Sequence, residues 1–536
     1  MTHKKAYNAL LNKLLLAATS GLCISVAQLD PTFSYLAWVG FVPLLVALRG
    51  ATYRQCYLLS LICGMCMFIS GKYWIFSFII TAKGFSEQLS LVLAVLYWLY
   101  CSHLLVFTML LVKWLTQHAR SLSLFSFPVM LTLFQIYYPM VFPWYLADSQ
   151  LSHLSVLQAI EYTGTPGVTL IVALANTLLV NIFMARWKNR WRDSVSKHFL
   201  AVCMLAGWFG YGLYSEQLWT NRIEHWRTLH VGFVQPNEPP DIGPRKIPYG
   251  YSSLYLPEME MTEQLIEYNV DLVVWPESQY KGIFDNKRIA DGYQSAVNNM
   301  NIPILLQDFD NLLSKDGEEK KINAALLIQP NSQTIDRYEK QRLIPFGETL
   351  PFANQWAWLD HHFSWLLGEF LGQIVAGQQH HFLTSTTADI IPLICYETVF
   401  PQYVAAAVQH YNKHSKDPKG GLLVALSNDG WFGSTHQPFQ HVLPSSLRAI
   451  ENRMPLVHVA NNGPSIAVTP TGKVLLQTEF MHSGSFHVNV PYTAEYESTV
   501  YARYPNGFSL CLLAMLAAQI VRRLRASRSK ADKFFS

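Results

Sequence analysis

Charged residues are scarce in this chain. Asp, Glu, Lys and Arg make up 14% of its 536 residues, whereas hydrophobic residues make up 51%. Soluble domains carry about 25% charged residues, so we expect a large share of the chain to lie in lipid. The polar part contains no basic run interleaved with aromatic residues, which argues against nucleic acid as a partner. No solenoid repeat or low-complexity segment is present.

Cysteine is nearly absent from the polar part of the chain. Seven of the eight cysteines lie in apolar stretches, where cysteine usually behaves as a small hydrophobe. Only Cys395 lies in a segment of mixed composition, and no second cysteine is there to form a disulfide with it. A lone thiol of this kind is either a buried structural residue or a candidate nucleophile, if a base and an anion stabiliser stand near it.

Long apolar runs account for the hydrophobic excess. A membrane span needs about 20 apolar residues, and the sequence predicts eight spans, of which the second and the last are short. The first follows three lysines but has no small-x-small cleavage site, so we interpret it as an uncleaved helix. The spans are expected at about 12–28, 32–48, 56–80, 88–114, 122–140, 165–185, 199–215 and 507–522.

Lysine and arginine are unevenly divided among the loops between these spans. The loops after the second, fourth and sixth spans and the tail after the last one are rich in both, and the alternate loops are poor in them. The positive-inside rule therefore predicts cytoplasmic termini and places the long polar segment before the last span outside. In a bacterial inner membrane this is the periplasm, an oxidising compartment that favours disulfides. A cysteine that has no partner there is either deeply buried or kept for chemistry.

We expect four regions along the chain. They are a transmembrane domain of about seven helices over 1–220, a periplasmic domain over 228–492, a C-terminal transmembrane helix over 505–524 and a basic cytoplasmic tail over 525–536. In the periplasmic domain, near-continuous apolar runs are typical of strands buried on both faces, with helices packed outside. Strands are predicted at 229–234, 271–275, 303–307, 324–329, 389–395, 421–427, 455–460 and 465–469, and helices at 258–269, 288–300 and 401–411.

Polar residues stand at the ends of several predicted strands. Glu277, Cys395 and Asn428 each lie at or just beyond such an end. Sites in α/β sheets gather beyond the carboxyl ends of strands, so we expect these side chains to share one sheet edge. Lys340 is a fourth candidate, in a loop that continues to Glu348.

Each candidate has a structural and a functional interpretation. Most glutamates and lysines are simply exposed. In the functional interpretation, Glu277 is a base whose pKa is raised by partial burial. Lys340 supplies positive charge to a thiolate and to a developing oxyanion. Glu348 and Glu397 would then orient that lysine.

Four motifs occur in the order of the Glu-Lys-Cys triad of the nitrilase superfamily, which this region resembles. They are Trp-Pro-Glu at 275–277, Lys340 with Pro-Phe-Gly-Glu at 345–348, Cys-Tyr-Glu at 395–397 and Ser-Asn-Asp-Gly-Trp-Phe-Gly at 427–433. A multi-span bundle with such a domain resembles the apolipoprotein N-acyltransferase family, and the segments around His441, Arg448 and 461–463 are similar to that family's later motifs.

The resemblance implies a fold and a set of site residues. The fold is a multi-span α-helical membrane bundle of about eight helices carrying an extracytoplasmic α/β nitrilase-like αββα sandwich domain. The implied catalytic residues are Glu277, Lys340 and Cys395, and the supporting residues are Glu348, Tyr396, Glu397, Asn428 and Trp431.

The resemblance also implies a reaction. The Cys395 thiolate would take an acyl chain from a phospholipid, by analogy phosphatidylethanolamine, and pass it to the N-terminal amine of diacylglyceryl-cysteine in an apolipoprotein. The implied partners are the phospholipid, the diacylated apolipoprotein and the lipid bilayer, with no cofactor and no metal. The pairs His361-His362 and His380-His381 do not have zinc-ligand spacing, and we interpret them as loop histidines.

The chain departs from the family's pattern after the first strand of the polar domain. Gln235-Pro236-Asn237 is followed by Glu238, and Ile247 follows Lys246 where the family has tryptophan. The acceptor therefore stays open. Three alternatives remain: a membrane-tethered amidase that uses water as acceptor, an N-acyltransferase with another amine acceptor, and a catalytically silent domain that scaffolds a membrane glycosyltransferase.

The stretch 356–371 is unusually apolar for an external domain, which marks a membrane or ligand contact. We predict a lid that dips into the leaflet, with Trp365, Leu366 and Phe370 as its contacts. Changing Trp365 and Leu366 together to glutamate is expected to lower the acylation of lipid substrates, because two charges would enter an apolar contact. Unchanged acylation in an assay with lipid substrates would contradict the lid.

Overall fold

The computed structural model describes residues 2–117, 123–187, 191–239, 246–278, 280–313, 319–349, 358 and 374–535. The chain forms two compact units. The first comprises Met1–Phe76, Ser86–Glu216 and Tyr504–Ser536, and the second comprises Ser77–Phe85 and Gln217–Arg503. Both β-sheets belong to the second unit.

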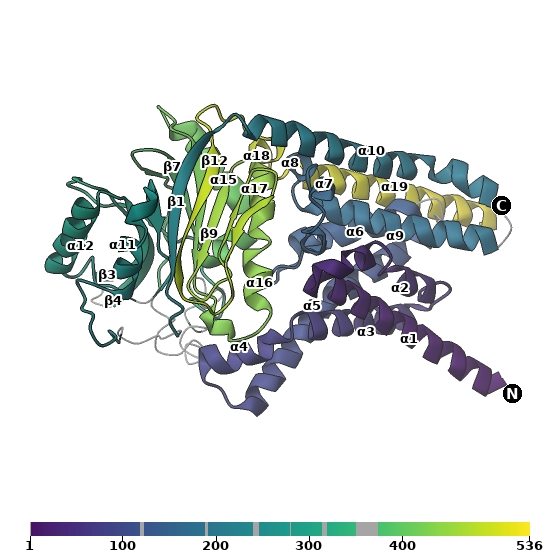
Figure 1. Cartoon of the computed structure of the whole chain (residues 1–536). Helices are drawn as coiled ribbons and strands as arrows, with labels where there is room; N and C mark the ends of the chain where they lie inside the picture. Colours follow the sequence, from purple (N-terminus) through teal and green to yellow (C-terminus); the bar gives the residue numbers. More distant parts are fainter. Residues whose placement is uncertain are drawn as a thin grey trace. The chain divides into compact units, whose positions relative to one another are not determined.

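Helices make up the first unit. Five helices in the described part of the chain are long and apolar enough to cross a membrane, and they lie within α1 (Thr2–Leu29), α3 (Tyr53–Gly71), α5 (Glu87–Thr116), α9 (Pro166–Trp187) and α19 (Gly507–Phe535). Helix α19 lies beside α6 (Ser123–Tyr137), as Figure 1 shows. The remaining helices of this unit are η1 (Pro31–Trp38), α2 (Val42–Ala47), η3 (Leu146–Gln150), α7 (Leu154–Leu157), α8 (Ile160–Thr163) and most of α10 (Trp191–Ile223). Helix α4 (Trp74–Lys83) belongs mostly to the second unit.

Two predicted spans are interrupted. The span predicted at 32–48 is a 3-10 helix, η1, followed by the short helix α2. The prediction of one continuous helix over 56–80 is wrong, because the backbone leaves the helical region at Lys72, between α3 and α4. The Lys72 ammonium is buried and donates to the carbonyl oxygens of Phe142 and Pro143. A break in the helix thus coincides with a buried cation that needs backbone oxygens.

Two six-stranded sheets form the second unit. The first has the order β12-β1-β2-β3-β4-β5, and the second β11-β10-β9-β8-β7-β6. The pairs β1–β2, β2–β3, β7–β8 and β8–β9 are parallel, and the others are antiparallel. The strands are β1 (Arg227–Gln235), β2 (Leu272–Val274), β3 (Ile304–Leu313), β4 (Glu319–Ile328), β5 (Asp336–Glu339), β6 (Leu383–Thr384), β7 (Asp389–Ile394), β8 (Gly421–Ser427), β9 (Leu456–Ala460), β10 (Ile466–Val468), β11 (Val474–Gln477) and β12 (Gly484–Tyr492).

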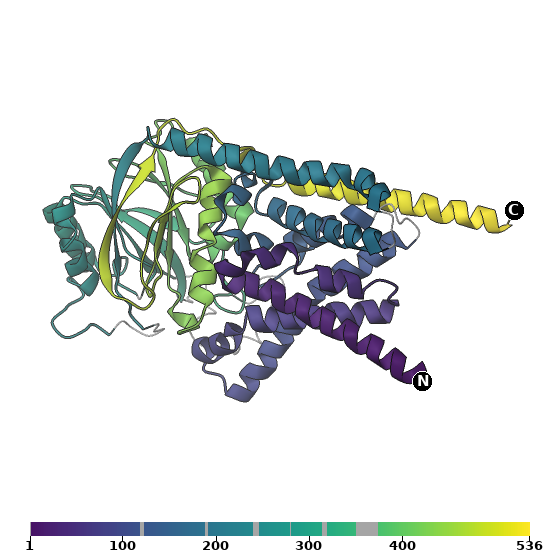
Figure 2. The same cartoon turned by 45° about the vertical axis from the view of Figure 1, so that its right-hand side comes forward.

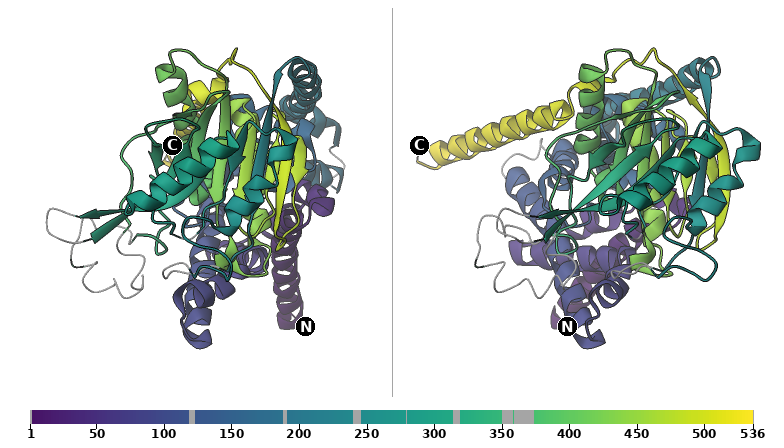
Figure 3. Two further views of the ribbon diagram at one scale, coloured as in Figure 1. Left: turned by 60° about the vertical axis from the view of Figure 1, so that its left-hand side comes forward. Right: turned by 90° about the vertical axis from the view of Figure 1, so that its left-hand side faces the viewer.

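The two sheets pack face to face between two helical layers. One apolar core joins residues of both sheets, including Val274, Ile394 and Leu426. A second core lies between the first sheet and helices α11 (Pro257–Glu263) and α12 (Lys287–Met300), which cross its outer face in Figures 1 and 3. A third covers the outer face of the second sheet with α15 (Pro401–His414), α16 (Gln437–Val442) and α17 (Ser445–Asn452), the green helices of Figure 2. The predicted αββα sandwich is confirmed.

Some predicted elements differ in extent. The helix expected at 258–269 ends at Glu263 and is followed by a separate 3-10 turn, η4 (Ile266–Tyr268). Asn269 closes that turn with a left-handed backbone (φ 49°), a conformation that asparagine tolerates better than most residues. The strands predicted at 303–307 and 324–329 are much longer, because β3 and β4 continue as an antiparallel ribbon through polar residues.

Candidate active site

The candidate residues come from both sheets, not from one sheet edge as expected. Glu277 follows β2 and Lys340 follows β5 in the first sheet. Cys395 follows β7 in the second sheet, where it begins the 3-10 helix η6 (Cys395–Val399). Because the two sheets pack face to face, strand ends of both meet over the same core. The Lys340 Nζ atom lies 3.5 Å from Glu277 Oε1, and the charges of both groups act on the Cys395 thiol.

Lys340 is held as a buried cation. Its side chain is 1% exposed, and its Nζ lies 2.8 Å from Glu348 Oε1 in addition to the 3.5 Å contact with Glu277. Burial alone would lower the pKa of Lys340, but the charges of the two carboxylates outweigh burial and raise it. Buried charges persist only when they are paired and hydrogen-bonded. Lys340 therefore stays protonated and presents a fixed positive charge beside Cys395.

A chain of amide groups fixes the Glu277 carboxylate. Asn323 Nδ2 donates to Glu277 Oε1 at 2.7 Å, and Asn323 Oδ1 accepts from Gln307 Nε2 at 3.0 Å. The Gln307 side-chain oxygen in turn accepts from the Ser278 backbone at 3.2 Å. Gln307 on β3 pairs with Ala325 on β4, two residues from Asn323, so both amides lie on the same face of this strand pair. The sheet itself therefore sets the direction of the carboxylate. Nothing in the sequence distinguishes Gln307 or Asn323 as site residues, because single amides inside strands have no distinctive pattern.

Cys395 sits on a sharp turn. Its φ of 50° lies in the left-handed region, which costs a non-glycine residue about 1–3 kcal/mol and is typical of functional sites. Its side chain is buried, and its carbonyl oxygen accepts from Thr398 Oγ1 and from His441 Nε2, both at 3.1 Å. Burial and the charge of Glu277 raise the pKa of the thiol well above its usual value, and Lys340 opposes this rise. The thiol therefore needs a base to become a nucleophile.

Glu397 has a different position from the one expected. Glu348 contacts Lys340, but Glu397 binds backbone N–H groups: Ile394 donates to it at 2.8 Å, Gln341 at 2.8 Å and Arg342 at 3.1 Å. The hydroxyls of Tyr338 and Tyr403 also donate to it. One buried carboxylate thus ties the segment after Lys340 to the residue before Cys395.

The other expected supporting residues shape the surrounding turns. Asn428 Oδ1 accepts from the Gly430 backbone and from Asn461, both at 3.2 Å, which holds the 3-10 turn η7 (Gly430–Phe432). The Tyr396 ring packs edge-on against Phe400 with ring centroids 4.8 Å apart. Trp431, the middle residue of that turn, is half-buried. The expected lid residues Trp365, Leu366 and Phe370 and the pair His361-His362 lie outside the described residues.

A buried imidazole stands behind the nucleophile. His441 Nδ1 lies 2.8 Å from Asp429 Oδ1, and its Nε2 donates to the Cys395 carbonyl oxygen. A carboxylate oxygen faces one ring nitrogen and a carbonyl oxygen the other, which favours the doubly protonated ring. Burial would lower the pKa of His441, but the Asp429 charge and its hydrogen bond outweigh burial and raise it. The sequence indicated His441 only because the segment around it is similar to a motif of the family. Its partners Asp429 and Cys395 are not adjacent to it in the chain.

No group of three or more His, Cys, Asp or Glu side chains that could hold a metal ion occurs among the residues that the structure describes. The described site brings together a thiol, a carboxylate and a buried cation. This set is suited to covalent acyl chemistry, in which a thiolate attacks a carbonyl carbon and a cation stabilises the oxyanion.

Comparisons with known proteins match both units. Residues 20–178 match the family model of the apolipoprotein N-acyltransferase N-terminal domain, and residues 254–490 match the carbon-nitrogen hydrolase family. The chain is 28% identical to apolipoprotein N-acyltransferase of Geobacter metallireducens over 95% of both chains. It is 26% identical to that of Rhodopseudomonas palustris over 86% of this chain and 85% of the relative. The solved amidase of Nesterenkonia sp. shares 16% identity, covering 49% of this chain and 90% of the amidase, with a TM-score of 0.34.

Changing Asn323 to leucine is expected to slow alkylation of Cys395 by iodoacetamide at neutral pH by roughly 10- to 100-fold. A hydrogen bond to a charged group contributes about 1.5–3 kcal/mol, and each 1.4 kcal/mol is about tenfold in rate. Asn489→Leu, an exposed asparagine on β12, is the matched control. Equal alkylation rates for both variants would show that Asn323 does not position Glu277.

Changing His441 to alanine is expected to lower both the stability of the protein and the reactivity of Cys395. The change leaves Asp429 as an unpaired buried charge, which costs about 3–5 kcal/mol, and removes a donor to the Cys395 carbonyl. Adding Asp429→Asn is expected to recover stability in thermal unfolding but not the alkylation rate. Recovery of both would show that His441 only neutralises Asp429.

Proposed function

The chain belongs to the apolipoprotein N-acyltransferase family, and we propose that it moves an acyl chain from a phospholipid, through a thioester on Cys395, to the N-terminal amine of diacylglyceryl-cysteine in apolipoproteins. The observation that carries this proposal is the convergence of Glu277, Lys340 and Cys395 in a membrane-bound acyltransferase. Each group has a matching task in a two-step transfer.

The first step forms the thioester. Glu277 takes the proton of the Cys395 thiol, and the thiolate attacks an ester carbonyl carbon of the phospholipid. Lys340, with a backbone N–H near Cys395, stabilises the oxyanion of the tetrahedral intermediate. The C–O bond then breaks, Glu277 returns its proton to the leaving alkoxide, and a lysophospholipid departs. Donors of this kind typically contribute about 100- to 1000-fold in rate.

The second step moves the acyl chain to nitrogen. The neutral α-amine of the diacylated apolipoprotein attacks the thioester carbon, so a C–N bond forms and the C–S bond breaks. Glu277 accepts the proton released by the amine and returns it to the Cys395 thiolate. An oxygen ester is exchanged for an amide, which requires no outside energy source and no cofactor.

The raised pKa of the Cys395 thiol supports a general-base mechanism over a preformed thiolate. The Glu348 contact supports the same assignment, because a second carboxylate keeps Lys340 charged while Glu277 changes its protonation state. The cation therefore serves both the developing thiolate and the oxyanion.

The membrane context supports a lipid donor. The protein is membrane-bound, and the basic residues in alternate loops support a bacterial inner membrane with cytoplasmic termini and a periplasmic catalytic domain. In that orientation the outer leaflet supplies both the donor, phosphatidylethanolamine by family analogy, and the acyl-anchored acceptor. The segment after Asn237 departs from the family's pattern and leaves the identity of the acceptor open. The lipopeptide experiment below tests that identity.

Incubation of the purified full-length protein with phosphatidylethanolamine alone is expected to add an acyl mass to Cys395. Intact-protein and peptide mass spectrometry measure this adduct. Glu277→Gln and Lys340→Met are expected to slow its formation by about 100-fold or more, and Cys395→Ala to abolish it. Cys203→Ala, at an exposed cysteine of the helical unit, is the matched control.

Adding a diacylated lipopeptide with a free N-terminus is expected to discharge the adduct and yield a triacylated peptide. Steady release of fatty acid without an amine would instead identify a hydrolase. Discharge by other amines but not by the lipopeptide would identify another acceptor. Absence of any acyl adduct under turnover conditions would contradict the thioester route.

A further inference from the structure

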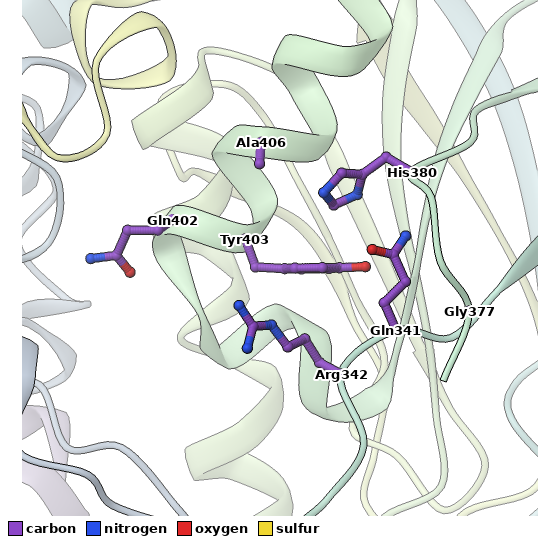
Figure 4. Close-up of a pocket in the computed structure, with 7 residues that line it drawn as sticks. All are labelled: Gln341, Arg342, Gly377, His380, Gln402, Tyr403 and Ala406. Carbon is purple, nitrogen blue, oxygen red and sulfur yellow. The ribbon is translucent and has the colours of Figure 1, made fainter. Parts of the chain in front are cut away.

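A cavity of about 360 Å³ lies in the second unit. Figure 4 shows the residues that line it, which are Gln341, Arg342, Gly377, His380, Gln402, Tyr403 and Ala406. Its volume is at the lower end of the range of small-molecule sites, about 300–1,000 Å³. None of the residues used in the proposed acyl transfer lines it.

Arg342 contributes a guanidinium whose hydrogen-bonding edge is available. Its carbon lies 5.6 Å from the centroid of the Tyr403 ring and 5.7 Å from that of Phe400, so aromatic faces hold the group in place. Within the described ranges of the chain, no carboxylate forms a salt bridge with it. A stacked guanidinium with a free edge is pre-organised to bind two oxygens of an anion.

Two further polar atoms in the cavity wall lack partners. Gln341 Nε2 and His380 Nδ1 are both buried, and neither has a hydrogen-bond partner among the described residues. The His380 ring lies 4.8 Å from the Tyr403 ring, on the side opposite Arg342 in Figure 4. Burial lowers the pKa of His380 to about 4, so its ring is neutral at pH 7 and one nitrogen can donate. Buried polar atoms without a partner are costly unless a ligand or water satisfies them.

Among the described residues that line the cavity, none is acidic. Gln402 and Tyr403 lie in the first turn of α15, a helix of 14 residues whose N-terminus carries partial positive charge. The nearby carboxylate of Glu397 is fully buried and accepts hydrogen bonds from five donor groups. The electrostatic balance of the cavity therefore favours an anion.

We propose that this cavity binds a phosphate group carried by a small polar substituent. Donors approach from three separate segments: the residues after Lys340, the segment before β6 and the first turn of α15. Acceptors spread over a tetrahedral phosphate match donors from several directions better than one planar carboxylate does. Both a phospholipid headgroup and a soluble phosphate ester carry this chemistry.

Hydrogen bonds connect the residues of the cavity wall to the turn that carries Cys395. The backbone N–H groups of Gln341 and Arg342 and the hydroxyl of Tyr403 all donate to Glu397, which also holds the residue before Cys395. A ligand that fixes these cavity residues therefore also fixes the segment that follows Lys340. Binding itself does not depend on the proposed acyl transfer.

Titration of the full-length protein with inorganic phosphate and with glycerol 3-phosphate tests the site. The protein is held in a maltoside detergent without phosphate, and isothermal calorimetry measures binding. Both probes are expected to bind the wild type, with glycerol 3-phosphate the tighter of the two. Arg342→Gln and Gln341→Leu are each expected to weaken binding by about tenfold or more. Lys413→Gln, which removes an exposed positive charge from the same helix α15, is the matched control and is expected to bind like the wild type.

The same titration in phospholipid nanodiscs separates the two sources. Loss of soluble-phosphate binding there, with binding retained in detergent, identifies a lipid headgroup as the occupant. Equal binding in both media identifies a soluble phosphate ester. No binding of either probe to the wild type in detergent, or equal weakening by Lys413→Gln and Arg342→Gln, overturns the proposal. Formation of the Cys395 thioester, measured on the same samples, reports on acyl transfer separately.

Discussion

The site depends on one buried cation. Lys340 sits between two carboxylates in an environment that would otherwise expel its charge. Neither glutamate would be stable there without the lysine, and the lysine would not remain charged without them. The first sheet supplies all three groups, since Glu277 follows β2 and Lys340 and Glu348 follow β5. The electrostatic half of the site is therefore built on one sheet, and the nucleophile is brought to it from the other.

Joining the two halves requires a second buried charge. Glu397 belongs to the turn of the nucleophile, yet it accepts hydrogen bonds from the two backbone N–H groups that follow Lys340. Burial raises the pKa of Glu397, and its many hydrogen bonds oppose that rise. Together with His441 at the Cys395 carbonyl, it holds a strained turn from two directions. The strain is maintained by polar contacts on both sides of the turn, as expected for a preorganised site.

The sequence predicted the interior of the fold better than its margins. The strands β1, β2, β7, β8 and β9 are near-continuous apolar runs, because both of their faces are buried, and such runs are visible without a structure. Strand β5 reads Asp-Arg-Tyr-Glu, and only Tyr338 is buried in it. Strand β12 alternates buried and exposed residues over part of its length. Edge strands of this kind depend on pairing with a neighbour, which the local sequence does not record.

The candidate site shows the same division. Glu277, Lys340 and Cys395 were found because motifs surround them, but their origin in two facing sheets was not, since motif order says nothing about sheet assignment. Asn323 on β4 contacts Glu277 beyond β2, with β3 between these two strands, and His441 on α16 contacts the Cys395 carbonyl oxygen. Tyr403 on α15 donates to Glu397. Each of the three has an ordinary sequence context. Their roles follow from side-chain contacts, which the sequence does not contain.

The pairing of β1 with β12 has a consequence for how such a chain can arise. Arg227, the first residue of the sandwich's opening strand, is the register partner of Tyr492, the last residue of its closing strand. The segment that forms the two sheets therefore begins and ends on neighbouring strands. A domain with adjoining ends can be spliced into the connection between two helices without altering either helix. The strand pairing of β1 with β12 therefore makes the sandwich a self-contained insertion in the sequence between α10 and α19.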